Sequence, residues 1–417
     1  MMKSQALFLL IIFLIFGCKE KAPEPSRPIT KKIEIGVVDS IQSDILGEKR
    51  TLWVYTPDDT TKKYPWLLLL DGDGHFQSVT GLVHQLSTIN GNTVLPEMVI
   101  VGITNTDRTR DLTPTHVDHV FGDSTFAKTS GGAPNFTKFI KEELIPYVEK
   151  NYPASSYRTL VGHSFGGLFA MHALYTEPEL FANYLAIDPS MWWDDQKLVK
   201  EAVQVMGNKA LSNKSLFVAV ANTMNKGMKV ETVGADTSEA TIQIRSILNL
   251  NNELSKLKNG LSFKWKYYDE DDHGSVPLIA EHDGLRYFFS WHSLKGVNDL
   301  FDKNSKATPQ EMLATVQGHY KNVSSRFGYE VLPPESLING MGYNFMMLGM
   351  NDKAFACFDL NIKNYPKSAN VFDSMGDYYI AEKDTTKALE NFEHALTLAK
   401  LDYTIDKLSK IKEARKK

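Results

Sequence analysis

The segment whose residue types are best suited to chemistry is 162–167, with the sequence Gly-His-Ser-Phe-Gly-Gly. It follows an apolar run, 157–161, and precedes a helix-like run of small and apolar residues, 166–175. A G-x-S-x-G segment between a strand and a helix is the pattern of a nucleophile elbow, in which the serine occupies a strained turn. We therefore predict that Ser164 is a nucleophile, and the alternative is an ordinary glycine-rich turn.

A serine hydroxyl is a weak nucleophile unless a neighbouring base takes its proton, and histidine titrates in the useful pH range. The best-placed histidine is His273, in the segment 269–275 after the strand pattern 263–268. The other histidines precede the nucleophile, lie in the elbow or in helical patterns, or lie beyond this part of the chain. We predict His273 as the base, and the alternative is a loop histidine solvated among carboxylates.

The acid that would orient His273 is not marked by the sequence. It is expected after the strand pattern 216–220, but 221–226 contains no carboxylate, and the first acid downstream is Glu231. Glu231 is the prediction, and a serine–histidine pair without a third member is also open. The rival acids are Asp271, Glu270 and Asp236.

Two backbone N–H groups are candidates for the oxyanion hole that acyl transfer requires. One belongs to Phe165, directly after the nucleophile. The other belongs to Asp73, in the loop predicted for 71–76 after a buried strand, since this loop supplies the second donor in α/β-hydrolases. The alternative for Asp73 is a simple Asp-Gly turn.

Two further segments follow predicted strands and are candidates for substrate binding. In 107–115, Arg110 is suited to a substrate carboxylate or phenolate, while a structural pair with Asp111 is at least as well supported. In 188–193, Trp192 and Trp193 would form an aromatic wall for a ring-containing substrate. Core packing is the alternative for both tryptophans.

The elements that must position these residues alternate between strand and helix patterns. Two strands with polar alternation, 33–38 and 50–55, predict an antiparallel pair at a sheet edge. Uninterrupted apolar runs are typical of parallel strands that are buried on both faces. These runs are 66–70, 98–102, 157–161, 184–187 and 216–220, and a further strand pattern, 263–268, follows them. The helical patterns are 77–89, 135–151, 166–176, 195–206, 241–257 and 278–292. The order predicts a doubly wound, mostly parallel α/β sheet, which binds ligands at the carboxyl ends of its strands.

Five motifs together resemble the putative-esterase family, which contains enterobactin-type siderophore esterases, esterase D and feruloyl esterases. They occur in the family's order over about 33–292, and the branch of siderophore-esterase-like serine hydrolases is the most similar. The motifs are 70–76, 108–115, 161–167, 189–193 and 273–277. The resemblance implies an α/β-hydrolase domain, 33–296, that cleaves carboxylic esters with Ser164 and His273 and needs no metal or cofactor. It leaves the acid and the particular ester open.

The N-terminus carries an apolar run, 6–16, which has the length of a signal-peptide core and is too short to span a membrane. It ends in 14–19, Leu-Ile-Phe-Gly-Cys-Lys, which resembles a bacterial lipoprotein signal in which Cys18 receives a lipid. We expect a signal peptide, 1–18, a flexible tether, 19–32, and a protein anchored to a membrane of the bacterial cell envelope. A plain signal peptide or an uncleaved anchor is the alternative.

The segment 297–417 has helical patterns and no buried-strand run, which predicts a small all-α domain. Three features recur at intervals of 34 residues: Met341-Gly342 as Met375-Gly376, Ala354 as Ala388, and Phe358 as Phe392. This period resembles tetratricopeptide repeats. We expect 309–327 to pack on the repeats as a further helix and the array to dock on the hydrolase. The repeats would bind a protein partner or simply stabilise the chain.

Composition narrows the function classes. The net charge of −4 over 417 residues gives no reason to expect nucleic acid as a partner. The two cysteines, Cys18 and Cys357, provide neither a disulfide framework nor a cysteine metal site. The sequence therefore predicts a serine hydrolase of small ester substrates. The alternatives are a non-catalytic envelope lipoprotein that binds or scaffolds through its repeats, and a peptidase or acyltransferase with the same catalytic residues.

Overall fold

The computed structural model describes residues 32–207, 209–302 and 305–415. The predicted signal peptide, Cys18 and nearly all of the tether lie outside these residues. The described chain contains an eight-stranded sheet with the order β1-β2-β4-β3-β5-β6-β7-β8. Its strands are β1 Val37–Ser43, β2 Glu48–Tyr55, β3 Tyr64–Leu69, β4 Val99–Ile103, β5 Ala154–His163, β6 Asn183–Ile187, β7 Ser215–Ala221 and β8 Ser262–Tyr268.

The sheet is antiparallel at one edge and parallel elsewhere. β2 pairs antiparallel with β1 and β4, whereas β4, β3, β5, β6, β7 and β8 run parallel. Central strands are apolar throughout because successive side chains enter different cores. In β3 and the residue after it, Leu67 and Leu69 join one hydrophobic cluster, and Leu68 and Leu70 join the other.

The edge strand β1 begins later than the predicted 33–38. Its polar residues are satisfied from a neighbouring helix and the loop after it, because the Asp39 carboxylate accepts hydrogen bonds from Tyr147 and Tyr152. The apolar residues Ile33 and Ile35, which suggested the earlier start, are instead 98% and 42% exposed. Alternation therefore predicted that a strand exists here but misplaced its bounds.

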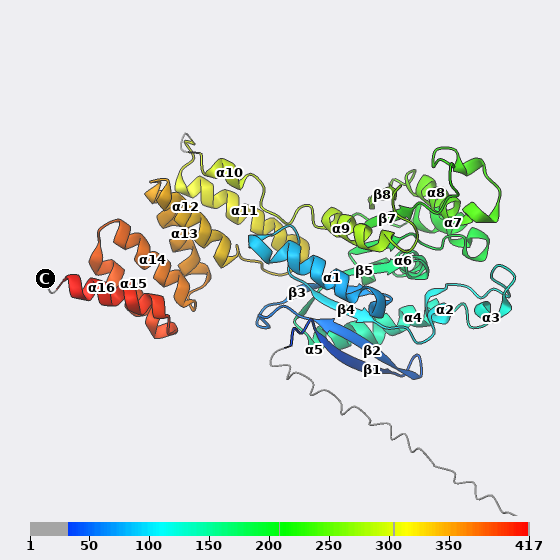
Figure 1. Cartoon of the computed structure of the whole chain (residues 1–417), viewed down its shortest axis with the longest axis horizontal. Coiled ribbons are helices and arrows are strands. Elements are labelled where there is room, and N and C mark those ends of the chain that lie inside the picture. The colour runs from blue at the N-terminus through cyan, green and yellow to red at the C-terminus, as the bar shows by residue number, and fades with distance from the viewer. Residues whose placement is uncertain (1–31, 208, 303–304, 416–417) are drawn as a thin grey trace, which may run out of the picture. The chain divides into compact units, whose positions relative to one another are not determined.

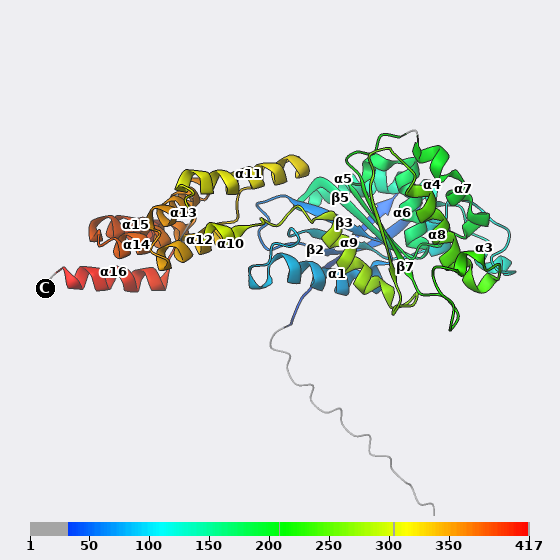
Figure 2. The same ribbon diagram turned by 90° about the horizontal axis from the view of Figure 1, so that it is seen from above.

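Helices cover both faces of the sheet. α1 (Gly72–Ser87) and α9 (Val276–Phe288) pack beside each other on one face, where they contribute to the same hydrophobic cluster (Figure 1; Figure 2). The other cluster receives helices from the rest of the domain: α4 Ala133–Phe139, α5 Ile145–Asn151, α6 Phe165–Thr176, α7 Trp193–Gly207 and α8 Ile242–Leu254. The helix predicted over 135–151 is α4 and α5 joined by a π-helical turn, Ile140–Leu144. Short helices α2 (Arg108–Leu112) and α3 (Ser124–Ala127) lie between β4 and α4.

The C-terminal segment is all-α, as predicted. It consists of α10 Val297–Leu300, α11 Pro309–Phe327, α12 Glu335–Met347, α13 Asn351–Asn364, α14 Ala369–Ala381, α15 Thr385–Leu398 and α16 Asp402–Ala414. The bounds of α14 and α15 are those of α12 and α13 moved by 34 residues. A Cβ on Gly342 would meet the ring of Phe358 at 2.6 Å, and one on Gly376 would meet Phe392 at 2.4 Å. Both hairpins thus use a glycine to bring an aromatic ring against the facing helix.

Helix α11 has the bounds predicted for it and joins two hydrophobic clusters. Its N-terminal half contributes Met312 and Val316 to the cluster of the C-terminal helices. Its C-terminal end contributes Phe327, whose ring centroid is 5.0 Å from Tyr157 of β5 and 5.2 Å from Trp291. Among the described helices, none has the length and apolarity to cross a membrane.

Candidate active site

Ser164 occupies a sharp turn between β5 and α6. Its backbone has φ 59° and ψ −114°, a strained conformation for a residue with a side chain. The turn is so tight that a Cβ on Gly162 would lie 2.2 Å from the carbonyl oxygen of Gly166. The Ser164 N–H donates to the carbonyl of Ile187 at 2.9 Å, and its Oγ lies 3.3 Å from Ser190 Oγ. This is the geometry of a nucleophile elbow.

His273 lies in the loop between β8 and α9 and makes a short contact with Asp188. The distance from His273 Nδ1 to Asp188 Oδ2 is 2.6 Å. Asp188 is fully buried, whereas the His273 side chain is 42% exposed. The hydrogen bonds of the described residues include none between Ser164 and His273, and such bonds are often long before substrate binds. A buried carboxylate on Nδ1 leaves Nε2 of the imidazole to serve as a base.

The prediction that Glu231 is the acid beside His273 is wrong. In the described chain, none of the four predicted acids has a hydrogen bond or ion pair with His273, including the rivals Asp271, Glu270 and Asp236. The loop after β7, where the acid was expected, contacts the 269–271 segment through Asn222, whose N–H donates to Asp271 O at 2.8 Å. The contact between the two loops is therefore made by a backbone N–H group and not by a carboxylate.

Asp188 begins the segment 188–193, in which sequence reasoning considered only the two tryptophans. It is the first residue after β6, which lies between β5 and β7 in the sheet, so the carboxylate faces the edge where Ser164 emerges. Ala221 N–H donates to its Oδ1 at 3.0 Å, and Gln243 Nε2 donates to its Oδ2 at 3.1 Å. Asp188 could have been identified in the sequence as a carboxylate that directly follows a fully buried parallel strand.

The segment predicted as an oxyanion loop is the first turn of a helix. α1 begins at Gly72, so Asp73 lies in that first turn, where N–H groups have no intrahelical acceptor. Phe165 is the first residue of α6 and directly follows Ser164. Two helix N-termini therefore flank the elbow, and a helix N-terminus favours developing negative charge.

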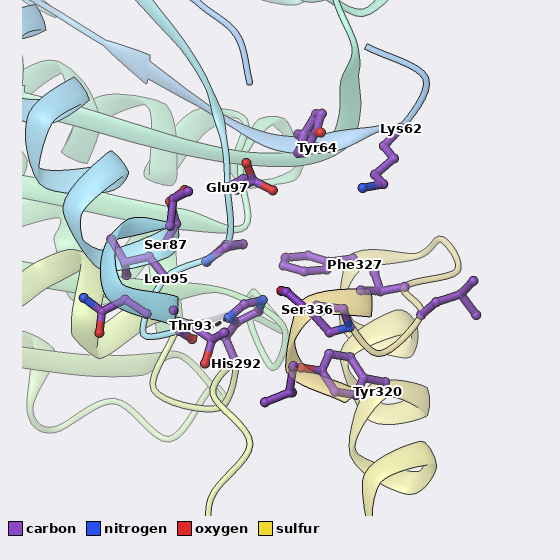
Figure 3. A pocket seen from close by; sticks show the side chains of 18 of the residues that line it. Lys62, Tyr64, Ser87, Thr93, Leu95, Glu97, His292, Tyr320, Phe327 and Ser336 are labelled. Carbon is purple, nitrogen blue, oxygen red and sulfur yellow. Dashed lines mark hydrogen bonds between the residues drawn. The ribbon is translucent and has the colours of Figure 1, made fainter. Parts of the chain in front are cut away.

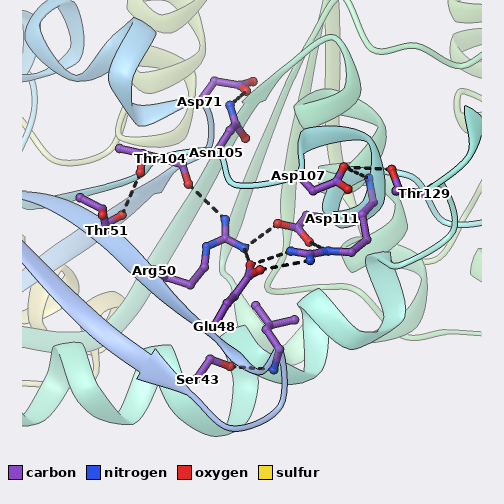
Figure 4. Close-up of polar contacts among 12 residues, drawn as sticks. Ser43, Glu48, Arg50, Thr51, Asp71, Thr104, Asn105, Asp107, Asp111 and Thr129 are labelled. Atoms are coloured by element: carbon purple, nitrogen blue, oxygen red, sulfur yellow. Dashed lines mark hydrogen bonds and ion pairs between the residues drawn. The ribbon is translucent and has the colours of Figure 1, made fainter. Parts of the chain in front are cut away.

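Arg110 is bound by a polar cluster rather than aimed at a substrate. Two members of this cluster, Glu48 and Asp111, are labelled in Figure 4. It donates to both carboxylate oxygens of Glu48 at 2.6 and 3.1 Å, and to Asp111 at 2.7 Å. These partners raise its pKa above the ordinary arginine value. The structural alternative stated for Arg110 therefore accounts for its contacts.

Arg108, two residues earlier, is the arginine beside the elbow. Its guanidinium donates to Asp71 at 2.6 and 3.0 Å and to the His163 carbonyl at 3.2 Å, and it lies 5.4 Å from the Phe165 ring centroid. Asp71 also accepts a hydrogen bond from Asn105 at 2.6 Å. The contacts of Arg108 fix the entry to α1 against the elbow.

The two tryptophans occupy different environments. Trp193 is buried, and its indole N–H lies 3.2 Å from Thr115, so it belongs to the core. Trp192 is half-buried and donates to Gln243 Oε1 at 2.6 Å. Its ring centroid is 4.8 Å from that of Phe121, which is 65% exposed and has φ 48°. Core packing, the alternative stated for the tryptophans, therefore accounts for Trp193, while Trp192 forms an aromatic pair with the exposed Phe121.

A pocket of about 840 Å³ lies elsewhere in the molecule (Figure 3). Its lining includes Tyr64, Glu97, His292, Tyr320 and Phe327. The residues of the elbow and of the His273–Asp188 pair do not line it. Its size alone therefore does not connect it with the chemistry of the elbow.

Several known proteins are similar to this chain in sequence. The model of the Esterase family, described as "Putative esterase", matches residues 43–255, just over half of the chain. A siderophore enterobactin esterase of Emericella nidulans is 35% identical over 38% of this chain and 57% of its own length. The ferri-bacillibactin esterase BesA of Bacillus subtilis is 30% identical over 42% of this chain and 66% of its own length. The chain thus spans somewhat less than two thirds of these curated relatives.

A solved structure matches more completely. The crystal structure of an IroE-like serine hydrolase from Shewanella oneidensis has a TM-score of 0.63 at 30% identity, over 78% of this chain and 98% of that chain. Together with the sheet order, this match confirms the predicted α/β-hydrolase fold with an all-α C-terminal segment.

Proposed function

Because the chain belongs to the putative esterase family, we propose that it is a serine hydrolase that cleaves carboxylic esters. The observation that carries the proposal is the coincidence of a strained serine with a His–Asp pair whose aspartate is fully buried. Ser164 has φ 59°, and the His273–Asp188 contact of 2.6 Å lies at the same edge of the sheet. Strained backbone persists where function requires it.

The proposed reaction proceeds through an acyl-enzyme. Ser164 Oγ attacks the ester carbonyl while His273 Nε2 takes its proton, and Asp188 holds the imidazole in the required tautomer. The N–H groups of Phe165 and Asp73 stabilise the oxyanion. The alcohol leaves with the proton from His273, and a water activated by the same histidine then releases the carboxylic acid and restores Ser164.

We propose siderophore-type esters as the substrate class. Of the curated relatives described above, one is named a siderophore enterobactin esterase and the other a ferri-bacillibactin esterase. The pair of Trp192 and Phe121, with Phe165 6.0 Å from Trp192, offers aromatic surface beside the elbow. Aromatic walls of this kind suit substrates that contain rings.

We expect that Ser164→Ala abolishes ester hydrolysis, because no other hydroxyl occupies the elbow. The measurement is hydrolysis of 4-nitrophenyl acetate together with labelling by a fluorophosphonate probe, using Ser290→Ala as the matched control. Ser290 is exposed and lies after α9, so the Ser290→Ala variant should retain both hydrolysis and labelling.

Failure of the wild type to label, where a known esterase labels, would favour the non-catalytic binding function. Cleavage of peptides but not of esters would favour a peptidase, and transfer of the acyl group to an acceptor other than water would favour an acyltransferase.

For the C-terminal helices we propose tetratricopeptide-like repeats that bind a protein partner. The support is the shared 34-residue spacing of the two hairpins and the equivalent contacts of Gly342 and Gly376. Repeats of this type present a surface formed by successive helices.

For the N-terminus we propose lipid attachment at Cys18 and a place in the bacterial cell envelope. We expect Cys18→Ala to release the protein from the membrane fraction, because an acyl anchor supplies the membrane affinity. Metabolic labelling with a fatty-acid analogue measures attachment directly. Equal labelling of the variant and the wild type would contradict the proposal.

A further inference from the structure

Three histidine rings lie in a row that begins at the proposed base. The ring centroids of His273 and His163 are 4.5 Å apart, with an angle of 42° between the rings. Those of His163 and His75 are 5.8 Å apart, with an angle of 72°. His163 ends β5, His75 lies in α1 and His273 precedes α9, so the row connects three elements. The mechanism proposed above assigns no role to His163 or His75.

The middle ring is uncharged. His163 Nε2 is buried and has no hydrogen-bond partner among the described residues. Burial lowers the pKa of His163 to about 4, and the positive charge that His273 and His75 can carry lowers it in the same direction. The carboxylates of Asp188 and Asp71 oppose this shift. Near neutral pH, His163 therefore presents a neutral ring to His273.

The far end of the row is a buried ion pair. His75 Nδ1 lies 3.3 Å from Glu281 Oε1, and the Glu281 side chain is 1% exposed. This contact with Glu281 is the main cause that raises the pKa of His75. Asp71 acts in the same direction, while burial and Arg108 oppose it. Glu281 belongs to α9, which begins three residues after His273. The contact between His75 and Glu281 thus joins α1 to α9, the helix that follows His273. The ring of His163 lies between the rings of His75 and His273.

We propose that His163 is a positioning residue for His273. Asp188 holds the imidazole at one atom, Nδ1, and a single hydrogen bond leaves a half-exposed ring free to tilt. The neutral ring of His163 packs against that imidazole and limits the tilt, so that Nε2 stays directed at the nucleophile. A displacement of about 1 Å in a catalytic group costs about 100-fold in rate. The inference rests on the proposed function.

The test compares two substitutions in the full chain. His163→Ala removes the ring, and His163→Phe keeps a ring of similar size without nitrogens. With 4-nitrophenyl acetate as the probe, we expect His163→Ala to lower kcat about 100-fold with KM little changed, and His163→Phe to stay close to the wild type.

Two results would overturn the inference. One is a wild-type kcat in His163→Ala, and the other is an equal loss in His163→Phe, which would mean that the nitrogens rather than the ring are required. Circular dichroism and the midpoint of urea unfolding show whether each variant is folded. Failure of the proposed function is seen separately, as hydrolysis that persists in Ser164→Ala.

Discussion

Replacing Asp188 with asparagine is expected to lower kcat by about 10⁴-fold and leave KM nearly unchanged. The reason is the tautomer of His273. The backbone N–H of Ala221 donates to Oδ1 of residue 188 and cannot turn away, whereas the Gln243 amide that donates to Oδ2 belongs to a side chain and can reorient. An asparagine would therefore keep its oxygen beside Ala221 and turn its NH₂ toward His273 Nδ1. The imidazole would then carry its proton on Nε2 and could not accept one from Ser164. Substrate does not contact Asp188 in the proposed mechanism, so its binding is preserved.

The matched controls are Glu231→Gln and Asp271→Asn, the isosteric changes at two acids that the sequence favoured. Among the described residues, neither side chain has a hydrogen bond or ion pair with His273, so both variants should keep kcat close to the wild type. The measurement is steady-state hydrolysis of 4-nitrophenyl acetate, with urea unfolding to show that Asp188→Asn is folded. A large loss in Glu231→Gln combined with an active Asp188→Asn would reverse the assignment of the acid.

The fold was predictable because parallel strands buried on both faces leave a strong trace in the sequence. Runs such as 66–70 and 216–220 have no polar position at all, and each lies on a strand of the structure. The edge strand β1 was less well predicted, because an edge strand has one face against other elements and its pattern depends on contacts such as Asp39 with Tyr147 and Tyr152. Local sequence does not contain those partners.

The site was predictable only where a motif is local. Ser164 carries its own signal, since the strand, the turn glycines and the helix are contiguous. The partner of His273 is 85 positions away in sequence and is selected by the position of β6 between β5 and β7. The expectation that the acid follows β7 placed it one strand too far. A rule that considers every acid directly after a buried strand would have included Asp188.

Arg110 illustrates a second limit. Charge in a loop near the catalytic edge suggested substrate binding, but 108–112 forms the short helix α2, capped by Asp107, whose carboxylate accepts the N–H of Arg110 at 3.0 Å. The cap turns Arg110 toward Glu48 of β2 and leaves Arg108 beside the elbow. A one-turn helix decides which arginine faces the site, and its cap is visible only in the structure.

Removing Asp111 is expected to cause the largest loss of stability, because it leaves a buried cation without its main partner. The Arg50 side chain is 1% exposed, and its guanidinium contacts Asp111, Glu48 at 3.3 Å and the carbonyl of Thr104 at 3.1 Å (Figure 4). Breaking a buried ion pair from one side costs about 3–5 kcal/mol of unfolding free energy. Since Glu48 remains near Arg50, we expect Asp111→Ala to lie at the lower end, about 3 kcal/mol.

The control for Asp111→Ala is Asp118→Ala, an aspartate 87% exposed whose contact with His116 is 3.9 Å long. A solvated pair of this kind contributes little, so this variant should stay within about 0.5 kcal/mol of the wild type. Urea unfolding followed by tryptophan fluorescence gives the free energy of unfolding of both variants.

Arg50→Met combined with Asp111→Ala should lower the free energy of unfolding by less than the sum of the two single changes, because the double variant no longer buries an unpaired charge. Additive losses, or a stable Asp111→Ala, would show that Arg50 is satisfied by Glu48 and Thr104 alone.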